Sequence, residues 1–332
     1  MSAERLLSVK LRRSTSSSRR SPGAGDGRPS PIVRPIFVLG AWRSGTTMIF
    51  QALSAHPDLW TLYRESQPVL DPSFPVRMVP GDSEVVTAAQ VDERTASELR
   101  WRFFEAVGNM EAAHGRAAKA VPLIARVRLS PLTTRLGIRV KRPPVRMVEK
   151  TPANCLRVGM LRAVFPDAQF IFVVRDPRGS IASLHHGWTS EPRFRTYRLP
   201  PDFRIEGYSG HHWCFGLIPG WERLNGATLT EVCATQWMIA NEYALADLPA
   251  DSRSVLTIRY EDVVARPGDV LSTIATWADL DPEPLRRFNE GLPVVNTWSR
   301  PRPDKWRRLE GELAKVEPLI APTSQRLGYG GV

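Results

Sequence analysis

The feature that most constrains the fold is a short apolar run followed by a glycine-rich turn, within residues 36–47. The run at residues 36–39 is typical of a buried strand. Gly40 and Gly45 then have the spacing of the phosphate-binding pattern G-x-x-x-x-G-K-[ST]. Glycine permits tight turns and close backbone approach, so several N–H groups can converge on one oxyanion. The sequence therefore predicts a strand, an anion-binding loop and a helix in succession.

One residue of that pattern is replaced. Thr46 stands where a nucleoside triphosphatase has the lysine that contacts the β- and γ-phosphates, while Thr47 keeps the hydroxyl position. Arg43 supplies a cation two positions before the second glycine. The loop suits a 5′-phosphate-like anion but lacks the lysine that drives phosphoryl transfer. Helical spacing of apolar residues from Thr46 to His56 indicates a helix whose N-terminus faces the anion; a plain threonine-capped turn is the alternative.

A second strand-to-helix junction follows the apolar run at residues 170–174, which predicts a central parallel strand. Arg175 comes directly after this run, and Ser183 lies two turns into the helix expected next. Open α/β sheets bind ligands at the carboxyl ends of their strands, so we expect both side chains to face one anion. Two such sites in one sheet suit a ligand with phosphates at two places.

The segments RSGTT (43–47) and VVRDPRGSIAS (173–183) resemble the two cofactor signatures of the sulfotransferase superfamily. The resemblance spans about residues 36–310. It implies a single α/β domain with helical insertions, in which helices flank a P-loop-like central parallel sheet. The implied reaction transfers a sulfuryl group from 3′-phosphoadenosine 5′-phosphosulfate (PAPS) to a hydroxyl or amine. The implied cofactor-binding residues are Arg43, Ser44, Gly45, Thr46 and Thr47 for the phosphosulfate and Arg175 and Ser183 for the 3′-phosphate.

The catalytic base is expected to be a carboxylate. The cytosolic branch of the superfamily has a histidine after Lys-Thr, but here Pro152 occupies that position and cannot act as a base. The chain is more similar to the bacterial and tyrosylprotein branch, in which a glutamate follows the first helix and its His-Pro. This resemblance implies Glu65 as the base, with a surface pairing to Arg64 as the alternative. The reserve candidates are Glu149, His185 and His186.

Lys150 ends the strand expected at residues 145–148. The resemblance makes it the cation on the oxygen that bridges phosphate and sulfate, where Arg43 would also stabilise charge; a solvated loop lysine is the alternative. Near the C-terminus, residues 298–306 resemble the basic loop that closes over the nucleotide. Arg300, Arg302 and Lys305 are the cofactor-binding candidates there, and an ordinary basic surface loop is the alternative.

The formal net charge of +11 is uneven along the 332 residues. Residues 1–31 have seven basic and two acidic residues and are rich in Ser, Arg, Pro and Gly, which predicts a disordered tail. Residues 32–332 are then the sulfotransferase-like domain. The tail could contact an anionic membrane weakly, or simply be solvated, or be a transit peptide.

Two alternative functions remain for the chain. A basic nucleic-acid-binding protein is disfavoured by the two phosphate motifs, so no nucleic-acid partner is expected. A P-loop kinase is disfavoured by Thr46.

The three cysteines, Cys155, Cys214 and Cys233, form no C-x-x-C pair and are odd in number. They predict free buried thiols in a reducing, cytoplasmic compartment. We expect no bound metal, because no ligand cluster is apparent, and no transmembrane segment, because no apolar run approaches 18 residues. The acceptor stays open between carbohydrate, lipid, metabolite and tyrosyl groups.

The remaining segments predict further elements. We expect helices at residues 85–107, 111–128 and 232–248, and a strand at residues 255–258 that leads into an Arg-Tyr-Glu-Asp segment also seen in the superfamily. Residues 188–221 are rich in aromatic side chains and turns. A loop of that length is usually functional, so it is predicted to be a wall or lid of the acceptor site, with packing against the core as the alternative.

Overall fold

A computed structural model describes residues 29–62, 64–108, 141–190, 192–292 and 304–330. Within these ranges the chain forms a six-stranded sheet in the order β3-β2-β4-β1-β5-β8 and a separate hairpin of β6 and β7. Neighbours in the large sheet are parallel, except that β3 runs antiparallel to β2. The strands are β1 Ile36–Leu39, β2 Trp60–Leu62, β3 Val107–Gly108, β4 Met147–Glu149, β5 Gln169–Val174, β6 Arg195–Arg198, β7 His212–Cys214 and β8 Val255–Arg259.

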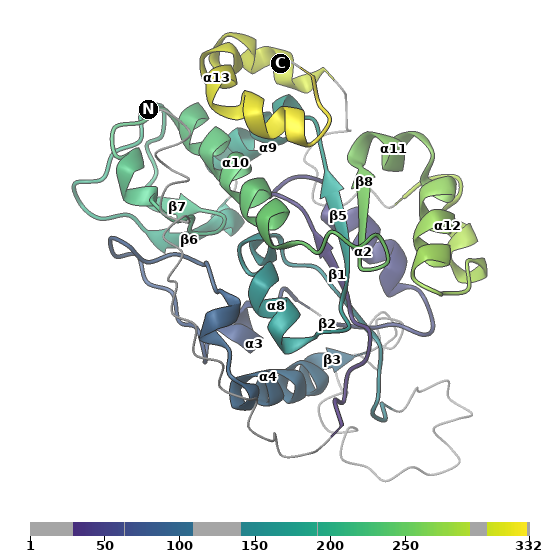
Figure 1. Ribbon diagram of the computed structural model, residues 1–332. Helices are drawn as coiled ribbons and strands as arrows, with labels where there is room; N and C mark the ends of the chain where they lie inside the picture. The colour runs from purple at the N-terminus through teal and green to yellow at the C-terminus, as the bar shows by residue number, and fades with distance from the viewer. Residues whose placement is uncertain (1–28, 63, 109–140, 191, 293–303, 331–332) are drawn as a thin grey trace.

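Helices cover both faces of this sheet (Figure 1). Alternate residues of a strand point to opposite faces. Phe37 accordingly belongs to the buried cluster that includes residues of α4, α8, α9, α10 and α13, whereas Val38 belongs to the cluster that includes residues of α2 and α12. The helices are α2 Thr46–Ser54, α3 Gln67–Leu70, α4 Glu93–Ala106, α8 Val158–Val164, α9 Pro177–Ser190, α10 Leu229–Asp247, α11 Tyr260–Ala265, α12 Pro267–Trp277 and α13 Glu310–Arg326. The predicted α/β architecture with a mostly parallel, helix-flanked sheet is confirmed.

The predicted strands at residues 36–39, 145–148, 170–174 and 255–258 correspond to β1, β4, β5 and β8, and the helix at 232–248 to α10. The single helix predicted at residues 85–107 is wrong in its first part. A 3-10 turn at Ala88–Gln90 precedes α4, which begins only after Asp92 because the Asp92 carboxylate accepts the N–H of Thr95 at 2.8 Å as an N-cap. The helix predicted at 111–128 lies outside the described residues, as do residues 1–28 of the predicted tail.

The segment at residues 188–221 is more ordered than the sequence suggested. It contains the β6–β7 hairpin, and its indoles are buried: Trp188 and Trp213 make a T-shaped contact with ring centroids 5.3 Å apart. The Trp188 Nε1–H donates to Gln236 Oε1 of α10 at 3.0 Å. Trp188 thus packs its ring against the hairpin while its polar N–H is satisfied by α10. The tryptophans of the segment and residues 213–218 therefore belong to the core, whereas most of residues 189–212 stay exposed or half-buried.

We expect Gly40→Ala to destabilise the protein by about 1–3 kcal/mol, because a Cβ there would lie 2.6 Å from the main-chain oxygen of Val173 in β5. Urea denaturation measures this change. Gly311→Ala in α13 is the matched control, since nothing lies within 4 Å of its added methyl group, and its stability should stay equal or rise by up to about 1 kcal/mol. Equal stability of Gly40→Ala and the parent would contradict the close approach of β1 and β5.

Candidate functional site

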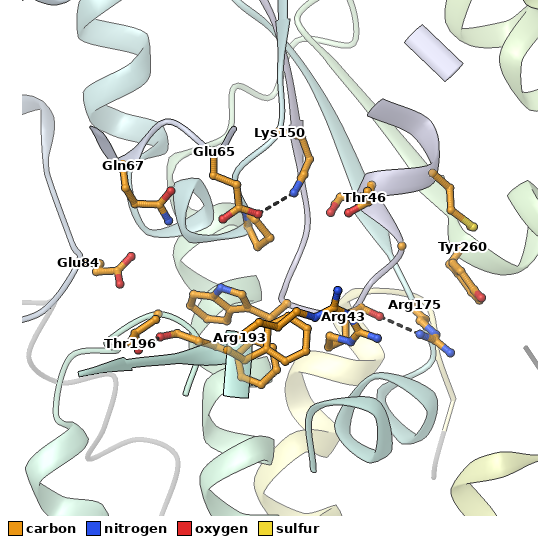
Figure 2. Close-up of a pocket in the computed structure, with 18 residues that line it drawn as sticks. Arg43, Thr46, Glu65, Gln67, Glu84, Lys150, Arg175, Arg193, Thr196 and Tyr260 are labelled. Carbon is orange, nitrogen blue, oxygen red and sulfur yellow. Dashed lines mark hydrogen bonds and ion pairs between the residues drawn. The ribbon is translucent and has the colours of Figure 1, made fainter. Parts of the chain in front are cut away.

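A cavity of about 210 Å³ lies at the edge of the sheet where the parallel strands end (Figure 2). The segments after β1, β2, β4, β5 and β8 all contribute side chains to its lining. Four cationic side chains line it against two carboxylates, so the cavity favours an anionic ligand. Of the residues predicted from the sequence, it brings together Arg43, Gly45, Thr46, Thr47, Glu65, Lys150 and Arg175.

The loop after β1 has the strained geometry of an anion-binding turn. Gly45 caps α2 with φ +89°, and a Cβ on it would lie 2.4 Å from Tyr260 Cδ2, so only glycine fits there. Arg43 adopts φ +71°, a left-handed conformation that is uncommon for a residue with a side chain. The N-terminus of α2 thereby opens on the cavity, and a helix cannot itself satisfy the N–H groups of its first turn.

Buried Ser44 does not line this cavity. Its N–H donates to the carbonyl of Ala41 at 3.0 Å and so helps to close the turn.

Arg43 connects the two predicted anion motifs. Its Nε donates to Ser183 Oγ on α9 at 3.0 Å, and its main-chain carbonyl accepts from Arg175 Nη1 at 2.8 Å. The guanidinium of Arg175 lies over the ring of Tyr260, 4.2 Å from its centroid. Ser183 itself is not in the cavity lining. Its contact with Arg43 means that it orients a cation at the site instead of facing the cavity.

Lys150 and Glu65 form an ion pair on the opposite wall, with Lys150 Nζ 2.6 Å from Glu65 Oε1 (Figure 2). The Lys150 side chain is only 10% exposed, so the alternative of a solvated loop lysine is wrong. Glu65 is 42% exposed, and its ion-pair partner in the described residues is Lys150, not Arg64. The sequence placed both residues at the site but did not indicate that they contact each other.

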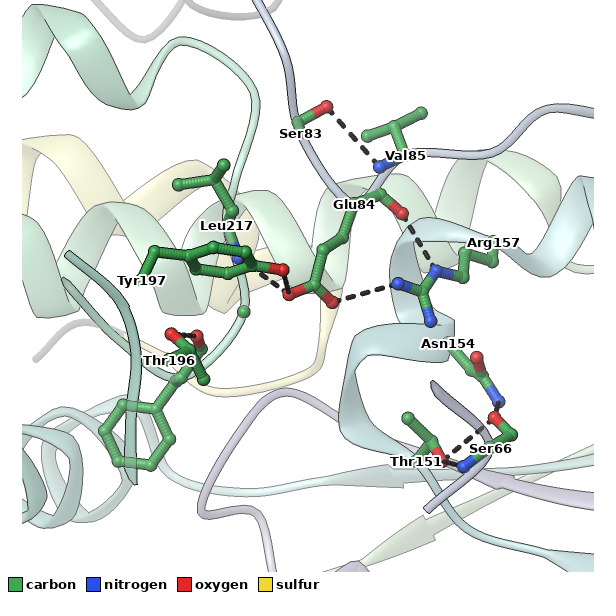
Figure 3. Close-up of polar contacts among 12 residues, drawn as sticks. Ser66, Ser83, Glu84, Val85, Thr151, Asn154, Arg157, Thr196, Tyr197 and Leu217 are labelled. Atoms are coloured by element: carbon green, nitrogen blue, oxygen red, sulfur yellow. Dashed lines mark hydrogen bonds and ion pairs between the residues drawn. The ribbon is translucent and has the colours of Figure 1, made fainter. Parts of the chain in front are cut away.

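The buried carboxylate of Glu149 connects the two segments that carry Glu65 and Lys150. Glu149 is fully buried and accepts hydrogen bonds from the Thr151 hydroxyl and from Asn154 Nδ2, the latter at 2.8 Å. Thr151 Oγ1 in turn accepts the N–H of Ser66 at 2.8 Å (Figure 3). The residues that follow Glu65 and Lys150 are thereby joined. Burial raises the pKa of Glu149 to about 7, although the Thr151 hydrogen bond and the charge of Lys150 lower it.

The reserve bases do not reach the cavity. Glu149 is absent from the lining and acts on the site only through its neighbours. His185 and His186 lie on α9 and are also absent from it; burial lowers the pKa of His185, and His186 Nδ1 lies 3.3 Å from Ser190 Oγ. Their geometry agrees with a structural role in that helix.

The C-terminal candidates are only partly described. Lys305 begins a 3-10 helix, Lys305–Leu309, and is exposed and outside the cavity lining. Arg300 and Arg302 fall outside the described residues. The next residue, Trp306, packs under Arg178 of α9, with the guanidinium 4.5 Å from a ring centroid of the indole. This contact ties the segment to the helix that follows Arg175.

Sequence reasoning missed several lining residues. Glu84 and Gln67 lie in short or irregular segments, where nothing in the local pattern distinguishes a cavity residue from a surface one. Residues 188–221, predicted to be a wall or lid of the acceptor site, contribute five residues to the cavity lining. The lining residues from that segment are Arg193, Phe194, Thr196, Phe215 and Gly216.

The predicted state of the cysteines is confirmed: Cys155, Cys214 and Cys233 are all buried and free. Within the described ranges, no group of three or more His, Cys, Asp or Glu side chains has the arrangement of a metal site. In the same part of the chain, no helix combines the length and the apolar character needed to cross a membrane.

Residues 35–284, most of the chain, match the sulfotransferase family. No curated protein sequence matches the chain.

Solved structures with a similar chain path include sulfotransferase STF9 from Mycobacterium avium, with 17% identity over 90% of this chain and 77% of that one and a TM-score of 0.46. A sulfotransferase from Alicyclobacillus acidocaldarius has 17% identity over 87% of this chain and 96% of its own, with a TM-score of 0.41. Mouse sulfotransferase SULT7A1 complexed with PAP has 14% identity over 88% and 85% of the two chains, with a TM-score of 0.39.

We expect the buried carboxylate of Glu149 to make stability depend on pH. Its pKa is raised in the folded chain from an ordinary 4.5 to about 7, so its contribution is fully present below about pH 4.5 and is lost as the pH rises through 7. Between pH 5 and pH 8 the free energy of unfolding of the parent should fall by about 1–3 kcal/mol more than that of Glu149→Gln. Denaturant titrations at several pH values measure this. Glu98→Gln, at an exposed position, should keep the parent's slope, and identical slopes for Glu149→Gln and the parent would refute the effect.

Proposed function

The chain belongs to the sulfotransferase family, and we propose that the cavity at the carboxyl edge of its sheet is where a sulfuryl group passes from PAPS to a hydroxyl or amine acceptor. The family assignment makes the chain a sulfuryl-transferring enzyme and sets aside the P-loop kinase and the nucleic-acid-binding protein as alternatives. One observation carries the proposal: the glycine loop, Arg175 and the Lys150–Glu65 pair all open on one cavity.

The residues of the cavity fit the donor. Gly45 lines the cavity at the N-terminus of α2, where a Cβ would collide with Tyr260, and cations outnumber carboxylates in the lining. Arg43, Gly45, Thr46 and Thr47 would hold the 5′-phosphosulfate at the N-terminus of α2, where the helix dipole favours an anion. Ser44 would act through the turn that it closes.

The 3′-phosphate is assigned to Arg175. Its guanidinium is held between the Arg43 carbonyl and the Tyr260 ring, so a charged donor with restricted freedom is available there. Ser183 would support this site by orienting Arg43. Lys305 is proposed to belong to the loop that closes over the nucleotide. Arg300 is proposed for the same role, although it lies outside the described residues. PAPS, when bound, supplies a sulfuryl group on an anhydride oxygen whose bond to sulfur breaks on transfer.

Glu65 is proposed as the general base. Lys150 fixes Glu65 Oε1, while Oε2 has no hydrogen-bond partner within the described residues and is available to take a proton from the acceptor. Lys150 is also placed to meet the negative charge that grows on the departing phosphate oxygen, together with Arg43 and the first N–H groups of α2. The ion pair then gives the base its orientation and the leaving group its counter-charge.

Residues 32–332 are proposed to be one domain, with residues 1–31 as a basic tail that contacts an anionic membrane weakly at most. No nucleic-acid partner and a cytoplasmic location are expected. The acceptor class is not restricted by the donor site itself, because acceptor groups are recognised by more variable segments.

We expect 3′-phosphoadenosine 5′-phosphate to bind more tightly than AMP or ATP, because Arg175 adds a contact to the 3′-phosphate. Arg175→Ala should reduce the preference over AMP by about 10- to 100-fold, the loss of a charge-assisted hydrogen bond worth about 1.5–3 kcal/mol. Titration calorimetry measures both affinities. Arg253→Ala, whose side chain is 92% exposed, is the control and should change neither. ATP binding as tight as the bisphosphate would overturn the donor assignment.

Glu65→Gln should lower kcat by about 10²–10⁴-fold, because the amide keeps the shape of the side chain but cannot accept the acceptor proton. The affinity for 3′-phosphoadenosine 5′-phosphate should change little, since Glu65 is assigned to neither phosphate. Steady-state kinetics with radiolabelled PAPS and calorimetry give the two values. A near-parent kcat in this variant would remove Glu65 from the chemistry and leave the donor site intact.

A further inference from the structure

Glu84 lies on the wall of the cavity at the end away from Arg175 and Tyr260, beyond Glu65 and Gln67 (Figure 2). It comes from the irregular segment between α3 and the 3-10 turn Ala88–Gln90, and it is only 3% exposed. The donor motifs occupy the other end of the cavity. Glu84 therefore faces the region that the proposed function leaves to the acceptor.

Three donors hold the Glu84 carboxylate in place (Figure 3). Tyr197 Oη and the N–H of Leu217 donate to Oε1 at 2.9 and 3.1 Å, and Arg157 Nη2 donates to Oε2 at 3.1 Å. Arg157 Nε also donates to the main-chain oxygen of Glu84 at 2.9 Å. These contacts come from α8's N-terminal boundary, the hairpin and the segment after it, so the carboxylate is fixed from several elements.

The buried Glu84–Arg157 ion pair is not explained by stability alone, because removing two charges from water costs free energy. Both side chains of the Glu84–Arg157 pair are less than 5% exposed, and a buried ion pair is often no more stabilising than apolar packing. Burial raises the pKa of Glu84, with Arg157 and the hydrogen bonds opposing it. The two carboxylate oxygens together can accept about four hydrogen bonds. Oε1 has two donors and Oε2 has one, so one acceptor position of this cavity-lining carboxylate is left.

The charges around Glu84 determine which ligand group can bind at the remaining acceptor position of its carboxylate. Arg157 balances the carboxylate, so a cationic group gains little there, and the remaining lone pair opposes an anionic one. A neutral hydroxyl can donate to it without an unpaired buried charge.

The adjacent lining is largely aromatic: Phe194 and Phe215 stack with ring centroids 4.6 Å apart, and Trp42 lies against Gly216. The guanidinium of Arg193, which also lines the cavity, lies over the Phe194 ring, 4.8 Å from its centroid. Aromatic side chains of this kind suit contact with a ring.

We propose that Glu84 recognises the acceptor by accepting a hydrogen bond from a second hydroxyl, one that is not sulfated, on a neutral ring-bearing molecule. Glu65 receives the reacting hydroxyl of the same molecule, and the aromatic wall holds its ring. The substrate class is thus a neutral ring compound with at least two hydroxyl groups. This inference rests on the proposed function, because it takes Glu65 to lie at the reacting hydroxyl.

The test compares neutral acceptors in pairs that differ by one hydroxyl: p-cresol with p-hydroxybenzyl alcohol, p-ethylphenol with tyrosol, and cyclohexanol with cyclohexanediol. Transfer from radiolabelled PAPS gives kcat/KM for each. In the parent chain the member with two hydroxyls should be favoured by about 10- to 100-fold in at least one pair. Glu84→Gln should reduce that preference to within about 3-fold, mainly by lowering kcat/KM for the dihydroxy member.

Two further variants separate recognition from folding. Glu84→Gln leaves Arg157 without its carboxylate, so the double variant Glu84→Gln/Arg157→Met removes both charges and should lose the preference in the same way. Glu242→Gln is the matched control, because Glu242 is a buried carboxylate paired with Arg326 between α10 and α13, outside the cavity lining; it should keep the preference. Calorimetry with 3′-phosphoadenosine 5′-phosphate accompanies every variant and should give unchanged affinity.

Each other outcome counts against the inference. Equal loss of activity on both members of a pair would make Glu84 a structural residue. An undiminished preference in the double variant, or no transfer to any of these acceptors by a parent chain that binds 3′-phosphoadenosine 5′-phosphate, would overturn it. Failure of the parent to bind that nucleotide would instead overturn the proposed function.

Discussion

The parallel pairing of β1 with both β4 and β5 is the constraint on which the rest of the site depends. Phe37 of β1 is in register with Glu149 of β4, and Leu39 with Phe172 of β5. Parallel strands end at the same edge of a sheet, so the glycine loop, Lys150 and Arg175 emerge side by side although more than a hundred residues separate the first from the others. All three strands are buried on both faces, so the sheet is covered on either side where these segments leave it.

Two buried carboxylates, Glu149 and Glu84, hold the irregular segments around the cavity in place. Glu149 binds Thr151 and Asn154, and through Thr151 it ties the residue after Glu65 to the segment after Lys150. Glu84 joins the hairpin to Arg157 in a similar way. Burying these charges costs stability, and hydrogen bonds from several elements offset that cost. The gain is that irregular segments hold defined positions around the cavity.

The secondary structure was predictable wherever local pattern and tertiary environment agree. The apolar runs of β1 and β5 are signals of this kind, and the three buried thiols followed from cysteine spacing. The helix α10 was also predicted, although almost all its residues from Leu229 to Ala244 are buried, on every side of the helix. The prediction was wrong at residues 85–92, where Asp92 caps α4 and delays its start. It also underestimated residues 188–221, because the hairpin is ordered by contacts with two helices: Trp213 packs against Trp188 of α9, and Gln236 of α10 donates to the Cys214 carbonyl.

The sequence by itself determined the family and the donor end of the site, because glycine spacing, Arg43 and Arg175 lie in contiguous motifs whose geometry is local. It also named Lys150 and Glu65. Only the tertiary structure decided that these two form an ion pair, that Ser183 orients Arg43, and that Glu84 reaches the far end of the cavity with Arg157 behind it. The physical reason is that such contacts join residues from 73 to 140 positions apart in the chain. Local pattern has no information on them, whereas the packing of strands, helices and hairpin sets every one.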